Sequence, residues 1–75
     1  MDTILKNILS NQFGVSVNEL SNATHIIEDL KADSLDIIEI IMSIEKGYKI
    51  KIEEEDYQDR STIGDLLELI KIKLS

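Results

Sequence analysis

The segment Asp33-Ser34-Leu35-Asp36 contains the residues of this chain that are best placed to do chemistry. It follows a stretch rich in turn-forming residues and precedes a run with helical periodicity, which puts Ser34 in the first turn of a helix. The N–H groups of a first turn have no acceptor within the helix, and the helix dipole adds partial positive charge beside them. An anion attached to the Ser34 hydroxyl would be stabilised there, although the flanking carboxylates oppose tight capture of free phosphate. Ser34 is thus a candidate for covalent modification, while the simpler interpretation makes it part of a helix cap.

The helix that positions Ser34 is expected to run from Asp33 to about Lys46. Its apolar positions are mostly isoleucines, which favour strands by propensity. They are Ile37, Ile38, Ile40, Ile41 and Ile44. Its polar positions are spaced three, four and three residues apart, which is the period of a helix and not of a strand. They are Asp36, Glu39, Ser43 and Lys46. Asp33 is a good N-cap, and Asp36 stands where a capping box places an acid.

A second helix is expected near the N-terminus, capped by Asp2 or Thr3 and ended by Gly14 in the left-handed conformation. Its apolar face would comprise Ile4, Leu5, Ile8, Leu9 and Phe13. Residues 15–33 then form a long connection that is pinned to the core by its apolar residues. A connection of this length indicates a function or a short helix within it.

The C-terminal third predicts a connector, a short helical turn and a last helix. Gly47 is expected to end the preceding helix before Tyr48, and residues 48–52 alternate like a strand with no partner, which favours an extended connector. Residues 53–59 could form a short helical turn, and Ser61 or Thr62 would cap the last helix. The apolar face of this last helix would comprise Ile63, Leu66, Leu67, Ile70 and Leu74.

These elements predict an all-α fold in one domain over residues 1–75. It would be a small four-helix bundle, with three main helices, one short helix and a long loop between the first and second helices. At this length the core is thin, and a two-domain enzyme with a cleft between its halves is excluded.

The chain is strongly acidic, with eight Lys and Arg against fifteen Asp and Glu and a formal net charge of −7. Nucleic acid and anionic membrane surfaces are therefore poor partners, because both are bound through clustered basic residues. Partners with basic patches are favoured instead. The chain has no cysteine and no apolar run long enough to span a membrane. We expect a monomeric, cytoplasmic protein.

No metal site is expected. His25 is the sole histidine, and a surface or loop position suits it better than a catalytic triad, which this chain is too small to complete. The acids between Glu53 and Asp59 lack the ligand spacing of an EF-hand loop, so they are interpreted as diffuse charge.

Three motifs resemble those of acyl carrier proteins. Residues 28–36 read E-D-L-K-A-D-S-L-D, which is similar to the family's E-D-L-G-A-D-S-L-D. Residues 13–15 read F-G-V where the family has L-G-V, and residues 62–65 read T-I-G-D where it has T-V-G-D. The resemblance spans nearly the whole chain and agrees with its length and acidity.

The resemblance implies that Ser34 carries a 4′-phosphopantetheine arm through a phosphodiester, added by a phosphopantetheinyl transferase. The thiol of the arm would hold acyl groups as thioesters for partner enzymes, most readily in fatty-acid biosynthesis, and the carrier itself would catalyse nothing. A specialised carrier for polyketide or other acyl transfer is the alternative within the class. The alternative from another class is an unmodified, acidic helical interaction module in which Ser34 is a replaceable cap.

The resemblance also makes the helix after Ser34 the surface that acyl-processing enzymes with basic docking patches recognise. The residues implied are Asp33, Leu35, Asp36, Ile38, Glu39, Met42 and Glu45. The acids would steer the encounter, and the apolar residues would anchor it. The simpler interpretation is a solvated acidic face with Ile38 and Met42 in the core. The other isoleucines of this helix are expected inside, where some of them would line a cavity for the acyl chain.

Four positions depart from the family pattern, one of them Glu53, which stands where the family usually has a proline. Lys31 replaces a glycine in the turn before Ser34, which removes the most permissive residue there. Gly47 lies late in the recognition helix. Arg60 occupies a position that is often aliphatic, so it bears on the size and lining of an acyl cavity.

Overall fold

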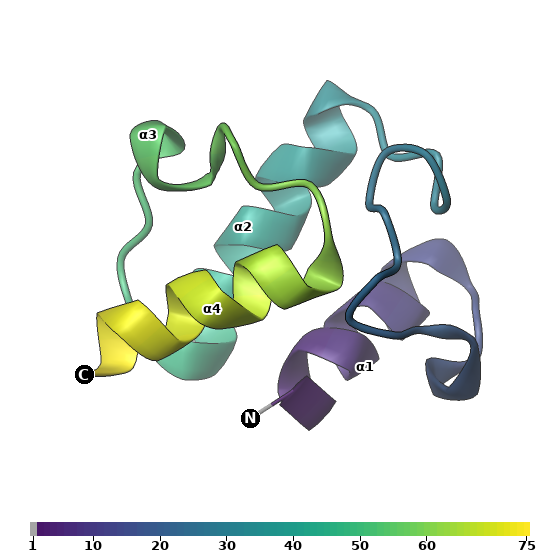
Figure 1. The fold of residues 1–75 in the computed structure, drawn as a ribbon, viewed down its shortest axis with the longest axis horizontal. Helices are drawn as coiled ribbons and strands as arrows, with labels where there is room; N and C mark the ends of the chain where they lie inside the picture. The colour runs from purple at the N-terminus through teal and green to yellow at the C-terminus, as the bar shows by residue number, and fades with distance from the viewer. Residues whose placement is uncertain (1) are drawn as a thin grey trace.

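The computed structural model describes residues 2–75, and helices account for its regular structure (Figure 1). There are three main helices: α1 (Asp2–Phe13), α2 (Ser34–Tyr48) and α4 (Ile63–Leu74). A 3-10 turn, η1 (Val17–Glu19), lies between α1 and α2, and the short helix α3 (Glu54–Tyr57) lies between α2 and α4. Residues 2–75 contain no strand, only an isolated antiparallel bridge between His25 and Thr62. The prediction of an all-α bundle with a long loop between the first two main helices is confirmed.

The core is aliphatic and is shared by the three main helices. α1 packs against both α2 and α4, and α3 lies against α4. The most deeply buried side chains come in pairs from α1, α2 and α4: Leu5, Leu9, Ile40, Ile44, Ile63 and Ile70. Complete burial of one such side chain is worth about 1.5–3 kcal/mol, so this small set supplies much of the driving force for folding.

The predicted starts of α2 and α4 are confirmed by their capping boxes. At α2, the Asp36 amide donates to the Asp33 carboxylate at 2.9 Å, and the Asp33 amide donates to the Asp36 carboxylate at 3.1 Å. Thr62 and Asp65 form the equivalent pair at α4. Each box satisfies amide groups that a helix leaves without acceptors, which fixes where the helix begins.

The predicted end of α2 is wrong, because the helix continues through Gly47 to Tyr48. Its C-cap is Lys49, which adopts the left-handed conformation at φ 58°. A Cβ at Gly47 would lie 3.3 Å from Ile4 Cγ2, so this glycine lies where α2 contacts α1 and does not end the helix. Tyr48 is therefore helical and not part of the connector, and its hydroxyl accepts a hydrogen bond from the Leu5 amide at 3.0 Å.

The other differences from expectation lie at the ends of helices. Within the described residues α1 begins at Asp2, so the predicted caps Asp2 and Thr3 both lie in the helix. Ile4 is 42% exposed and Leu74 is 47% exposed, so neither belongs to the buried core as predicted. Leu69 is buried in α4 instead, adjacent to Ile70.

The long loop is held against the start of α4 by backbone hydrogen bonds. The Ile26 amide donates to Ser61 at 2.8 Å, and the Gly64 amide donates to Asn22 at 2.9 Å. Gly14 enters the loop at φ 68°, as predicted, and Lys31 adopts φ 61° near its end. These contacts fix the path of the loop that leads to Asp33 at the start of α2. Figure 1 shows the loop as the dark-blue segment beside α1 and α2.

Candidate functional site

Ser34 is the first residue of α2, and its side chain is exposed. Within residues 2–75 its hydroxyl makes no hydrogen bond, and the amides of Ser34 and Leu35 have no acceptor. The cap is formed by Asp33, so the simpler interpretation of Ser34 as the capping residue is wrong. The hydroxyl is left free next to two amide donors at the positive end of the helix dipole.

The carboxylates beside Ser34 are fixed in place. Asp33 and Asp36 accept each other's amides in the capping box. Gln12 of α1 donates from Nε2 to the Asp36 carbonyl at 3.1 Å and approaches the Asp36 carboxylate at 3.5 Å. Gln12 thereby joins the end of α1 to the first turn of α2, a contribution that sequence reasoning missed because nothing in the local pattern marks it.

The outer face of α2 carries three large apolar side chains in contact with solvent. Leu35 is 63% exposed, Ile38 is 50% exposed and Met42 is 62% exposed. Their spacing of three and four residues puts them on one stripe of the helix, beside the exposed Glu39. The interpretation that Ile38 and Met42 are core residues is therefore wrong, and such a contiguous stripe is typical of an interaction surface.

Glu45 lies at the far end of this stripe and is half-buried. Its carboxylate accepts a hydrogen bond from the Ile52 amide at 2.8 Å, which holds the connector after α2. One oxygen of Glu45 is therefore engaged within the fold, unlike the freely exposed carboxylate of Glu39.

Two open depressions border the stripe. The first has a volume of about 220 Å³ and is lined by Ser34, Ile37, Ile38, Glu54 and Tyr57. The second has a volume of about 420 Å³ and is lined by Gln12, Glu39, Met42, Ser43 and Lys46. Glu54 and Tyr57 were not predicted at the site, because only the tertiary fold brings α3 next to Ser34.

The isoleucines of α2 that face inward are placed as predicted. Ile40, Ile41 and Ile44 are buried, and Ile37 is partly buried against them. A small enclosed cavity of about 30 Å³ lies among α2, α3, α4 and the long loop. Its lining residues are Ile26, Ile27, Ile37, Ile40, Ile41, Tyr57, Arg60, Ser61 and Leu66.

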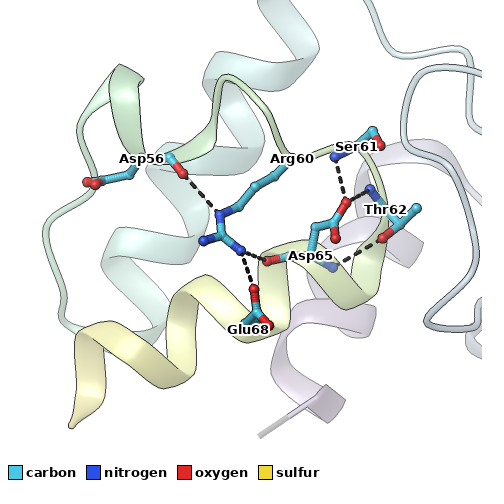
Figure 2. Close-up of polar contacts among 6 residues, drawn as sticks. All are labelled: Asp56, Arg60, Ser61, Thr62, Asp65 and Glu68. Carbon is cyan, nitrogen blue, oxygen red and sulfur yellow. Dashed lines mark hydrogen bonds and ion pairs between the residues drawn. The ribbon is translucent and has the colours of Figure 1, made fainter.

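Arg60, which lines this cavity, belongs to a polar network that also contains Asp56 and Asp65 (Figure 2). Amide donors from Ser61 and Thr62 hold the pKa of the Asp65 carboxyl below its ordinary value. The Glu53 amide and the Lys73 ammonium lower the pKa of Asp56 in the same way. Both carboxylates are thus stabilised in their charged form at the junction of α3 and α4.

His25 lies in the long loop, as predicted, with its Nε2 3.7 Å from the Glu28 carboxylate. In the described part of the chain, no group of three or more His, Cys, Asp or Glu side chains is arranged to hold a metal ion. Within residues 2–75, no helix has the length and apolar character needed to cross a bilayer.

The surroundings of Ser34 fit a phosphodiester-linked arm. The exposed hydroxyl is open to attachment, and the free amides of Ser34 and Leu35 match the negative charge of a phosphodiester. The depression next to Ser34 has room for part of a flexible chain. These residues could therefore hold 4′-phosphopantetheine.

Comparison with known proteins agrees with this geometry. Residues 3–70 match the phosphopantetheine attachment site family. The chain is 39% identical to the acyl carrier protein of Chlamydia caviae over 69 residues, which cover 92% of this chain and 90% of the relative. It is 34% identical to the acyl carrier protein of Thermotoga maritima over 70 residues, which cover 93% of this chain and 86% of the relative. The chain belongs to the acyl carrier protein family, whose members are non-catalytic carriers that use phosphopantetheine as their cofactor.

Proposed function

We propose that this chain carries acyl groups on a 4′-phosphopantetheine arm attached to Ser34, as a monomeric one-domain carrier in the cytoplasm. The observation that carries the proposal is the exposed Ser34 hydroxyl, free of hydrogen bonds to residues 2–75 and adjacent to two unpaired amides. When bound, the arm supplies a thiol that holds acyl groups as thioesters. The residues of the chain supply attachment, charge stabilisation and recognition.

The attachment of the arm would proceed at the Ser34 Oγ. A phosphopantetheinyl transferase would direct this oxygen to the phosphorus of coenzyme A that bears pantetheine. A phosphodiester forms, the pyrophosphate bond breaks, and adenosine 3′,5′-bisphosphate leaves while the hydroxyl proton passes to a base of the transferase. The capping box of Asp33 and Asp36 would hold Ser34 at the start of α2 while the transferase binds the surface around this serine.

The stripe of Leu35, Ile38 and Met42 would anchor partner enzymes. Apolar anchors at the centre of an interface contribute most of its affinity, while charges around them set the association rate and the register. Asp33, Asp36, Glu39 and Glu45 would supply those charges toward basic patches on the partners. Fatty-acid biosynthesis is the setting we propose, because the motifs around Ser34 resemble those of its discrete carriers; specialised polyketide or other acyl transfer is the second candidate.

Transferase loading tests the proposal. The protein is incubated with coenzyme A, Mg²⁺ and a broad-specificity transferase, and its intact mass is measured. We expect a gain of one phosphopantetheine group that Ser34→Ala abolishes and Ser43→Ala, on the same helix, leaves unchanged. A protein that gains no mass would be an unmodified interaction module instead. A mass gain that persists in Ser34→Ala would contradict attachment at Ser34.

Charge reversal at Glu39 tests the recognition surface separately. Glu39→Lys is exposed on α2 and should leave the free energy of unfolding within about 0.5 kcal/mol of the wild type. It should slow association with a basic acyl-transfer enzyme at low salt, because the steering charge changes sign. Asp59→Lys, which reverses an exposed charge in the turn after α3, is the matched control and should have a smaller effect. Equal association rates for the wild type and Glu39→Lys would contradict recognition through this face.

A further inference from the structure

The enclosed cavity lies directly behind the depression that borders Ser34. Ile37 and Tyr57 line both spaces, so these two side chains form the partition between them. An apolar chain that starts from an arm on Ser34 and follows the depression would therefore reach the cavity at this partition. The cavity is lined mostly by aliphatic side chains, which favour such a chain over water.

The cavity is too small to hold more than the beginning of an acyl chain. Its volume is about 30 Å³. An apolar cavity that accepts a ligand the size of benzene measures about 150 Å³. The wall of the cavity must therefore move before a medium or long chain can enter.

Arg60, which lines the cavity, makes hydrogen bonds to both α3 and α4 (Figure 2). Its Nε donates to the Asp56 carbonyl of α3 at 3.1 Å, and its Nη1 donates to the Asp65 carbonyl of α4 at 2.8 Å. Nη1 also pairs with the Glu68 carboxylate at 3.0 Å. One guanidinium thus links α3 to α4, and its side chain, only 22% exposed, forms part of the cavity lining.

Polar contacts help to hold α3 against α4, beside the partly buried Tyr57. α3 has no buried residue, and a second cation, Lys73, pairs with the Asp56 carboxylate at 2.9 Å. Opening the cavity toward α3 would break directional hydrogen bonds of Arg60 in a partly buried place, where such bonds are stronger than at a fully exposed one. A longer acyl chain would have to displace these bonds in order to be buried.

We propose that Arg60 is a specificity-determining residue that keeps the cavity closed, so that medium and long acyl chains carried by this protein remain outside the helical core. This inference rests on attachment at Ser34 and concerns what happens to the chain afterwards. An aliphatic side chain at this position would form no link between α3 and α4, and the cavity would open as the chain lengthens. Arg60 thereby leaves the acyl chain accessible to partner enzymes.

Methyl resonances inside the cavity provide the test. The wild-type protein is loaded at Ser34 with butyryl, octanoyl or dodecanoyl arms, and the shifts of the Ile40, Ile41 and Leu66 methyl groups are measured against the same protein with the unacylated arm. We expect these shifts to be small and independent of chain length in the wild type. In Arg60→Ala they should grow from butyryl to dodecanoyl.

Two further variants separate the link from the volume of the side chain. Arg60→Met keeps an unbranched side chain without the hydrogen bonds, and its shifts should also grow with chain length. Glu68→Gln keeps both backbone-carbonyl contacts of Arg60, and its shifts should stay as flat as those of the wild type. Each variant is compared with its own unacylated form, so a change in basal stability does not affect the result. If Arg60→Ala does not fold, the test rests on Arg60→Met.

Wild-type shifts that grow with chain length as strongly as those of Arg60→Ala would overturn the inference, as would flat shifts in both Arg60 variants. Failure of the underlying attachment is a different result, because the intact mass would show no arm on the wild type or an arm that persists in Ser34→Ala. The mass is measured before the spectra, so the two failures are distinguished.

Discussion

Replacement of Gly47 by alanine should stabilise the protein, although glycine at this position looks like a helix terminator. Gly47 lies within α2, one residue before its end, and does not adopt a left-handed conformation. Alanine in a helix interior is favoured over glycine by about 0.8–1.0 kcal/mol. A new Cβ would lie 3.7 Å from Ile8 Cδ1, an ordinary contact, and 3.3 Å from Ile4 Cγ2, which is slightly tight. Ile4 is exposed and can move by a few tenths of an ångström.

The expected gain is about 0.5–1 kcal/mol, because part of the propensity term is lost near a helix end. For a chain of this size that corresponds to a rise in Tm of about 3–6 °C. Urea and thermal unfolding followed by far-UV circular dichroism, at one fixed ionic strength, would measure it. A lower Tm for Gly47→Ala would refute the reasoning, since it would mean that α1 and α2 cannot accommodate a methyl group.

Gly64→Ala is the contrasting variant. The added Cβ would lie 3.0 Å from the Asn22 carbonyl oxygen, which already accepts the Gly64 amide at 2.9 Å. Backbone cannot yield as a flexible side chain does, so the loop must shift, at a cost of about 1–3 kcal/mol. The two alanine substitutions should therefore move Tm in opposite directions, and the same unfolding experiment detects both.

Three further predictions concern the site and its supports. Lys31→Gly should stabilise the protein by about 0.5–1 kcal/mol in urea unfolding. Lys31 is in the left-handed conformation at φ 61°, and the strain that glycine removes there is larger than the conformational entropy that glycine adds to the unfolded chain. An unchanged or lower urea midpoint would contradict this reasoning. Asp33→Ala should cost about 1 kcal/mol through loss of the α2 cap, while Asp59→Ala, exposed in the turn after α3, should cost less. The pKa of Asp65 is lower in the folded protein than its ordinary value of 3.8. The contribution of its carboxylate to the free energy of unfolding is therefore complete above pH 3.8 and is lost as the pH falls through the folded pKa. Acid titration of Tm should therefore show a shallower loss below about pH 4 for Asp65→Asn than for the wild type, and identical slopes would count against this contribution.

The local features of α2 could be predicted from the sequence, because they depend on neighbours in the chain. The period of Asp36, Glu39, Ser43 and Lys46 identified the helix against the strand propensity of its isoleucines. The acids at positions 33 and 36 predicted the capping box that places Ser34 in the first turn. The exposure of the apolar stripe on α2 followed only from the family resemblance, since periodicity alone allows a core interpretation.

The remaining features depend on contacts between distant segments. Gly47 looked like a helix end because glycine is common there, but it lies inside α2, where the helix contacts Ile4 and Ile8 of α1. Lys49 and Lys31 adopt left-handed conformations with no local signal in their residue type. The roles of Gln12 and Tyr57 beside Ser34 require the tertiary fold, and so does the link that Arg60 makes between α3 and α4.

The intact mass of the protein purified from its native cells tests the central claim most directly. We expect a mass above that of the 75-residue chain by one phosphopantetheine group, with acyl groups on a fraction of the molecules. Hydroxylamine should remove the acyl groups and leave the arm, and peptide mapping should place the arm on Ser34. Acyl masses that increase in steps of one ethylene unit would support fatty-acid biosynthesis over other acyl transfer. A protein that carries no arm in its native cells, or carries it on another residue, would contradict the account.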